Sequence, residues 1–249
     1  MWSGTMTGNI RKTVFVLAVL IVNINTVLAA DPKPAEIEEL FFNTPLSAAI
    51  TLESGVTYLF SGRTYTKTNK DTEKGFAKGY PKILPGGWKG FPRVWPGISA
   101  GFSGKGKTLF MFSGKNKFGK ETYYQLTDIK VDKGYPKEIT DDWIKLPKGW
   151  SKGDLAVVGA AFYHPPTKKH YMFKDNQYAR LKDLKVEKAY AKKLPGIWKG
   201  MPKNFAKGID ASTFRNGHIY MFKDDEYIRF TKTKMDKGYP KKIKGNWPE

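Results

Sequence analysis

Four times along this chain, a tyrosine is followed eight residues later by a tryptophan. The pairs are Tyr80/Trp88, Tyr135/Trp143, Tyr190/Trp198 and Tyr239/Trp247. The tyrosines lie 55, 55 and 49 residues apart, and self-similarity at such a period indicates a repeat architecture. Because the offset is the same each time, the chain is predicted to contain four copies of one structural unit.

Each copy has the pattern of a small antiparallel sheet. In the last copy, alternating aromatic residues predict strands over 219–222 and 227–230, joined by a turn at 223–225. Proline in the Gly-Tyr-Pro sequence removes a donor from the sheet, so only a short edge strand or one helical turn is expected before the tryptophan. Four strands in each of four copies predict an all-β fold, a four-bladed β-propeller. An alanine opens each predicted innermost strand: Ala48, Ala100, Ala160 and Ala211.

The last copy resembles a hemopexin-like repeat. The resemblance rests on Tyr220-Met221-Phe222-Lys223-Asp224, Tyr227-Ile228-Arg229-Phe230, Gly238-Tyr239-Pro240 and Trp247. The third copy is similar, and the first two are more divergent. The resemblance covers residues 46–249 and implies a ring of four blades around a narrow central channel. The predicted blades span residues 46–97, 98–157, 158–207 and 208–249.

Two departures from the family pattern bear on ring closure and on metal binding. Family members commonly join the last blade to the first by a disulfide, but this chain has no cysteine, so closure must be noncovalent and Trp247 is expected to dock. The family often has aspartate at the start of each first strand, and only the fourth blade keeps it. The resemblance implies a channel cation, calcium or sodium, held mainly by backbone carbonyls, here at Ser47, Ser99, Gly159 and Asp210.

Residues 1–29 are predicted to be a secretory signal peptide, so the protein is expected to be secreted and extracellular. Arg11 and Lys12 precede the apolar run 14–22, and small residues follow near residue 29. A membrane anchor is the alternative, but the apolar run is about nine residues long, whereas a span needs about twenty.

A secreted chain without cysteine must draw its stability from its core. Seven tryptophans, thirteen tyrosines and sixteen phenylalanines supply that core, so the repeat tyrosines and tryptophans are expected to pack between blades. Residues 30–45 would form a short lead-in segment. Pro32 and Pro34 are expected to oppose regular structure there, and the apolar residues 40–42 are expected to pack on the ring.

The chain carries a formal net charge of +20, and +18 remains after removal of the predicted signal peptide. A domain so charged attracts polyanions in a salt-dependent way. The pattern favours a surface that binds an extracellular polyanion, such as a sulfated glycan, or an acidic protein. A solvated basic surface that repeats with the blade is the alternative. Lysines recur two residues before and two residues after each repeat tyrosine: Lys78, Lys82, Lys133, Lys137, Lys188, Lys192, Lys237 and Lys241.

The sequence contains neither the His-Glu-x-x-His zinc motif nor the Gly-x-Ser-x-Gly nucleophile motif, so the protein is expected not to be an enzyme. Haem would need an axial ligand, and His164, His170 and His218 are the candidates, although turn or surface roles are favoured for them.

Three function classes remain. The first is a binding module for anionic polymers or acidic proteins. The second is a carrier of a small ligand, haem or a metal ion at the channel or disc face, and the third is a protein-interaction scaffold. Specific nucleic-acid binding is not expected, and the oligomeric state stays open.

Overall fold

Four antiparallel sheets make up the part of the chain that the computed structural model describes. The described residues are 34–68, 75–92, 97–104, 106–115, 121–139, 150, 160–183 and 185–248. The predicted signal peptide, Gly159 and Trp143 lie outside them. Residues from Lys33 onward form one unit.

The strands of each sheet follow one another along the chain. Blade one contains β1 (Ala48–Thr51), β2 (Thr57–Ser61), β3 (Thr64–Lys67) and β4 (Lys82–Ile83). Blade two contains β5 (Ala100–Ser103), β6 (Thr108–Lys115) and β7 (Glu121–Thr127), with β8 (Lys130–Val131) and β9 (Lys137–Glu138) both paired to β7. Blade three contains β10 (Ala160–His164), β11 (Lys169–Lys174), β12 (Gln177–Lys182) and β13 (Lys185–Lys193). Blade four contains β14 (Ala211–Arg215), β15 (His218–Lys223) and β16 (Glu226–Thr231), with β17 (Lys234–Met235) and β18 (Lys241–Lys242) both paired to β16. Two short 3-10 helices span Pro165–Thr167 and Phe205–Lys207.

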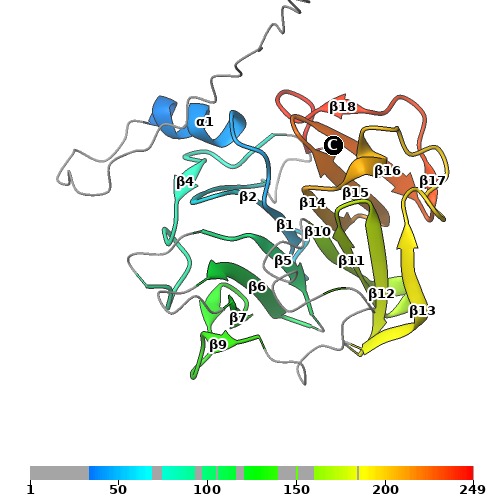
Figure 1. Cartoon of the computed structure of the whole chain (residues 1–249). Helices are drawn as coiled ribbons and strands as arrows, with labels where there is room; N and C mark the ends of the chain where they lie inside the picture. Colours follow the sequence, from blue (N-terminus) through cyan, green and yellow to red (C-terminus); the bar gives the residue numbers. More distant parts are fainter. Residues whose placement is uncertain are drawn as a thin grey trace, which may run out of the picture. The chain divides into compact units, whose positions relative to one another are not determined.

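The four sheets form a ring, which confirms the four-bladed β-propeller. The first strands β1, β5, β10 and β14 gather at the centre, and each contacts the first strands of both neighbouring blades (Figure 1). Small side chains suit this crowded position, and the four opening alanines are buried. In every blade, the alanine lies opposite a phenylalanine of the next strand: Phe60, Phe112, Phe173 and Phe222.

The described repeat tryptophans fill the spaces between blades, as expected. Trp88 and Trp198 are buried, and the ring of Trp198 lies 5.4 Å from that of Phe230 in the next blade. At the interface of blades two and three, buried Trp150 donates a hydrogen bond from Nε1 to Gln177 Oε1 at 3.0 Å. Aromatic rings therefore supply the core in place of disulfides.

Blade four closes onto blade one through noncovalent contacts. Trp247 is buried in a cluster that also contains Ala49 and Leu59 of blade one, so its predicted docking is confirmed. On the channel side, the hydroxyls of Thr51 in β1 and Thr213 in β14 lie 2.7 Å apart.

The lead-in segment contradicts one expectation. A helix, α1 (Pro34–Phe42), forms where proline was expected to oppose regular structure. Proline is tolerated in the first helical turn because the amide it lacks would have no partner there. Phe41 is buried in the same cluster as Trp247, which we call the closure cluster, as expected for this apolar run. Leu40, in contrast, is 54% exposed.

Candidate functional site

The lysine that follows each repeat tyrosine by two residues has the same structural place in every blade. It lies in the outermost part of the sheet, opposite a tyrosine of the third strand. The pairs are Lys82/Tyr65, Lys137/Tyr123, Lys192/Tyr178 and Lys241/Tyr227. These four lysines therefore lie at equivalent points around the ring.

In three blades, this lysine lies over its own repeat tyrosine. The Nζ atom lies 4.9 Å from the centre of the tyrosine ring for Lys82, 4.8 Å for Lys137 and 5.0 Å for Lys241. The rings are those of Tyr80, Tyr135 and Tyr239, respectively. Such cation–π contacts hold an ammonium group in place at modest cost in hydration. Burial raises the pKa of Tyr80 to about 12, so this phenol stays neutral at physiological pH.

Most of the eight predicted lysines are open to solvent. Lys78, Lys133 and Lys237 are exposed, as are Lys82, Lys137 and Lys192, whereas Lys241 is half-buried. Lys188 lies in β13, and its side chain is outside the described residues. Lys133 also borders a hollow of about 730 Å³ with Lys89, Lys130, Asp128 and Asp132.

A second repeated position, two residues after the third-strand tyrosine, carries a base or an amide. We call it the third-strand position, and its members are Lys67, Gln125, Arg180 and Arg229. In blades two to four it bonds to a residue three before the repeat tyrosine, which we call the acid position. The members of the acid position are Ala77, Asp132, Glu187 and Asp236.

In three blades, the carboxylate at the acid position accepts a hydrogen bond from the side chain at the third-strand position. Gln125 Nε2 donates to Asp132 Oδ2 at 2.9 Å, and Arg229 Nε donates to Asp236 Oδ2 at 2.6 Å. Partial burial alone would raise the pKa of Asp236, but hydrogen bonds from Arg229 and Thr231 hold that pKa below its ordinary value.

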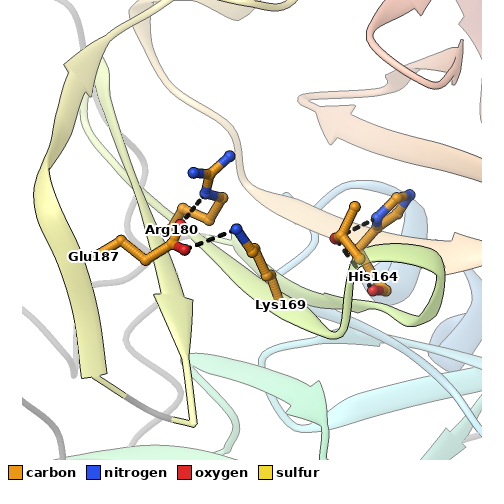
Figure 2. A network of polar contacts seen from close by, with 5 residues as sticks. His164, Lys169, Arg180 and Glu187 are labelled. Atoms are coloured by element: carbon orange, nitrogen blue, oxygen red, sulfur yellow. Dashed lines mark hydrogen bonds and ion pairs between the residues drawn. The ribbon is translucent and has the colours of Figure 1, made fainter.

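In blade three, Glu187 accepts hydrogen bonds from both Lys169 and Arg180 (Figure 2). Glu187 Oε1 lies 2.7 Å from Lys169 Nζ. Burial alone would raise the pKa of Glu187, but these two bases lower it below its ordinary value. This carboxylate therefore stays charged and neutralises part of the blade's basic surface.

The described residues predicted to hold a channel cation through their carbonyls use their amides to bond within their own blades. The amides of Ser47, Ser99 and Asp210 donate to second-strand carbonyls at 2.8, 2.9 and 2.9 Å. Asp210 Oδ2 also accepts from the Asp224 amide at 2.7 Å. Among the described residues, no group of three or more histidines or carboxylates is arranged to hold a metal ion. The channel cation thus stays a prediction.

A cavity of about 450 Å³ lies where the first strands end. Its lining draws on all four blades, including Thr51, Ser103, Tyr163, Thr213 and Arg215. Ser103 Oγ donates to the Thr51 carbonyl at 2.6 Å, so the polar lining also ties neighbouring blades together.

The three histidines do not converge. His170 is buried between blades two and three, with its ring 5.1 Å from Phe102 and 4.9 Å from Tyr163. His164 Nδ1 is 2.8 Å from the Thr167 hydroxyl, and His218 Nδ1 is 3.2 Å from that of Thr231 (Figure 2 shows His164). Haem could reach the buried His170 ring only if blades two and three separated, so the haem alternative would depend on His164 or His218 and stays a prediction.

Another cleft, which we call the closure cleft, has a volume of about 610 Å³ and lies where blade four meets blade one. Its lining includes Phe76 and Tyr80 from blade one, together with Lys241, Lys244 and Trp247 from the chain's last residues. Glu38 of α1 is the one carboxylate in this lining. Sequence reasoning did not anticipate this cleft, because its walls lie more than 150 residues apart in the chain.

None of the helices in the described part of the chain has the length and apolar character needed to cross a membrane.

Comparison with known proteins agrees with this fold. Residues 158–203 and 209–249 match the sequence model of the Hemopexin family. Vitronectin of Homo sapiens is 28% identical over 150 residues, which cover 59% of this chain and 28% of the relative. Vitronectin of Sus scrofa is 29% identical over 144 residues, covering 57% of this chain and 28% of the relative. The chain thus spans about a quarter of the length of these relatives.

Two solved plant proteins share the fold. A plant albumin from Cicer arietinum showing hemagglutination has a TM-score of 0.64 and 22% identity, covering 82% of this chain and 95% of the albumin. A 2S albumin seed protein from Dolichos has a TM-score of 0.62 and 20% identity, covering 82% and 97%.

These observations define the class of protein as a four-bladed propeller of hemopexin-like repeats. Blades three and four match the Hemopexin family directly, and the first two blades repeat the same strand order.

Proposed function

We propose that this protein is a secreted, non-enzymatic binding module that recognises an extracellular anionic polymer through its repeated lysines. The hemopexin-like repeats and the likeness to vitronectin support a binding role. The basic, apolar and small residues of positions 1–29 support secretion. The high positive charge supports a partner of opposite charge.

One observation carries the proposal: the lysine at the same place in each blade is held over an aromatic ring in three of them. A long lysine side chain loses rotamer freedom when it binds an anion. Contact with Tyr80, Tyr135 or Tyr239 restricts that side chain beforehand, so less entropy is lost on binding. A solvated basic surface without a partner would not need such repeated contacts.

Affinity would come from several weak contacts acting together. An exposed ion pair contributes only about 0–1 kcal/mol, but linked contacts raise avidity by roughly 10²–10⁴. A sulfated polysaccharide is long enough to meet more than one blade, so it is the partner we favour. Acidic proteins share the charge and form the alternative.

The test is retention on immobilised heparin by the protein without residues 1–29. We expect strong retention at low salt that weakens towards physiological salt, where the Debye length is about 8 Å. Neutralising the eight lysines blade by blade should reduce retention in steps. Weak retention at low salt, or retention unchanged after all eight substitutions, would reject the proposal, and retention on polyglutamate alone would favour acidic proteins.

The central cavity favours a second candidate, a carrier of a small ligand. Its hydroxyl and guanidinium lining suits a small polar anion. A panel of small carboxylates at millimolar concentration should then raise the melting temperature. Arg215→Gln, which would remove the guanidinium charge from this lining, should abolish that rise, and an unchanged melting temperature with the whole panel would reject the candidate.

A further inference from the structure

Blade one differs from the others at the acid position, where it has Ala77. The equivalence is structural as well as sequential. The Ala77 amide donates to the Lys67 carbonyl at 2.9 Å, and the Asp236 amide donates to the Arg229 carbonyl at the same distance. Blade one therefore keeps the base at its third-strand position but has no acid at the position that neutralises this base elsewhere.

Two ammonium groups lie over Tyr80, and a third lysine is close to it in sequence. Lys67 Nζ and Lys82 Nζ lie 5.4 and 4.9 Å from the centre of its ring, and exposed Lys78 precedes it by two residues. Within the described residues, none of these three lysines forms an ion pair with a carboxylate. Summed over the third-strand position, the acid position and the two repeat lysines, the formal charge is +3 in blade one, +1 in blade two, and +2 in blades three and four.

The closure cleft continues this basic surface. Tyr80 lines this cleft of about 610 Å³, and Lys241, Lys244 and the apolar Phe76 are among its other lining residues. Lys244 Nζ also lies 5.3 Å from the centre of the Phe42 ring. A cleft of this size with apolar walls and a few polar groups suits a compact organic group rather than a bare ion.

We propose that blade one holds the principal oxyanion site of the ring. Sulfate or carboxylate groups of an anionic polysaccharide bind Lys67, Lys78 and Lys82 around Tyr80, and an adjacent sugar enters the cleft beside Lys241. This inference rests on the proposed function and adds that the four blades contribute unequally. Close like charges repel one another, and a bound oxyanion relieves that repulsion, so affinity is greatest where the positive charge is most concentrated.

Ala77→Asp tests the site by giving blade one the acid found in the other blades. The matched control is Asn176→Asp, an equal charge change at an exposed turn position of blade three, where blade four already has Asp225. We expect Ala77→Asp to weaken heparin binding about five-fold at low salt and the control to weaken it less than about two-fold. Thermal unfolding should verify that both variants fold.

A second pair of variants removes charge instead. Lys82→Gln and Lys137→Gln change equivalent lysines in blades one and two, each of which lies over its own tyrosine. Lys82→Gln should cause the larger loss. Heparin and the unsulfated polymer hyaluronan, compared side by side, should distinguish sulfate from carboxylate recognition.

The outcomes separate the two proposals. Equal losses within both pairs of variants would overturn the blade-one site and leave polyanion binding by a symmetric ring. Retention of heparin by none of the proteins, including the unmutated one, would reject the proposed function and this inference with it.

Discussion

At the scale of single residues, the repeat tyrosines link the core to the charged surface. Each described repeat tyrosine packs edge-on against the third-strand tyrosine, with ring centres 5.5–5.6 Å apart. Its other surface contacts the lysine two residues later. One aromatic side chain thus stabilises the blade and also positions a cation, which explains how a packing residue and a binding surface repeat with the same period.

His170 makes stability depend on pH. Burial lowers the pKa of His170 to about 4, although the Ser103 backbone and the Asp183 carboxylate act in the opposite direction. Because the folded-state pKa lies below the unfolded value of about 6.5, protonation favours unfolding. The difference corresponds to about 3 kcal/mol, present above pH 6.5 and lost as pH falls towards about 4.

Urea unfolding between pH 7.5 and 4.5 should measure this loss. Blades two and four have Leu109 and Ile219 at the position equivalent to His170, so His170→Leu removes the titration with a residue the fold accepts. The variant should show a much flatter pH dependence over this range. An unchanged slope would mean that other groups cause it.

At the scale of elements, neighbouring blades are joined by short parallel backbone bridges. Lys89 donates its amide to the Ile129 carbonyl at 3.0 Å and accepts from the Val131 amide at 2.9 Å. Gly90 follows with a φ of +87°, and a Cβ there would lie 2.9 Å from Val131 Cβ. The close approach of blades one and two at this bridge therefore requires glycine.

Gly90→Ala should destabilise the protein in two ways. Left-handed backbone costs a residue with a Cβ about 1–2 kcal/mol, and the clash adds about 1–3 kcal/mol. Gly134 has a φ of +88° with nothing near its missing Cβ, so Gly134→Ala should show only the first cost. Urea denaturation of both variants measures the difference, and equal losses would show that the bridge tolerates the extra atom.

At the scale of the whole molecule, the ring closes through residues from both ends of the described chain. The closure cluster combines Phe41 of α1 with Trp247 near the C-terminal end. The ring of Trp247 lies 4.6 Å from Tyr220 and 4.9 Å from Phe222. Because the two chain ends meet in one apolar cluster, the lead-in helix is part of the propeller's stability.

Phe41→Ala should therefore destabilise the ring by about 3–5 kcal/mol, the usual cost of removing a buried phenylalanine. The adjacent Leu40 is 54% exposed, so Leu40→Ala should change stability by less than about 0.5 kcal/mol. Thermal or urea unfolding of the two variants gives the comparison. Similar stabilities for both would show that α1 does not support closure.

The sequence by itself determined the four repeats, their main strands and the burial of Trp88, Trp198 and Trp247. Strand and turn formation depends on residues close together in the chain, so alternating aromatics and Gly-Tyr-Pro sequences were enough to predict them. The repeat period also predicted that the lysines at positions 82, 137, 192 and 241 occupy equivalent places. Pro34 was misread because a proline that opposes a helix interior suits its first turn.

Tertiary structure alone decided which charges are paired and where a ligand has room. Asp236 lies beside Arg229 because β16 and the segment after β17 lie side by side. Ala77 occupies the equivalent place in blade one, so only this comparison reveals that blade one lacks the acid. The closure cleft needs Tyr80 and Lys244 in the same place, although they are far apart in sequence. This cleft depends on how blades four and one pack around the ring, and no local pattern of residues records such a contact.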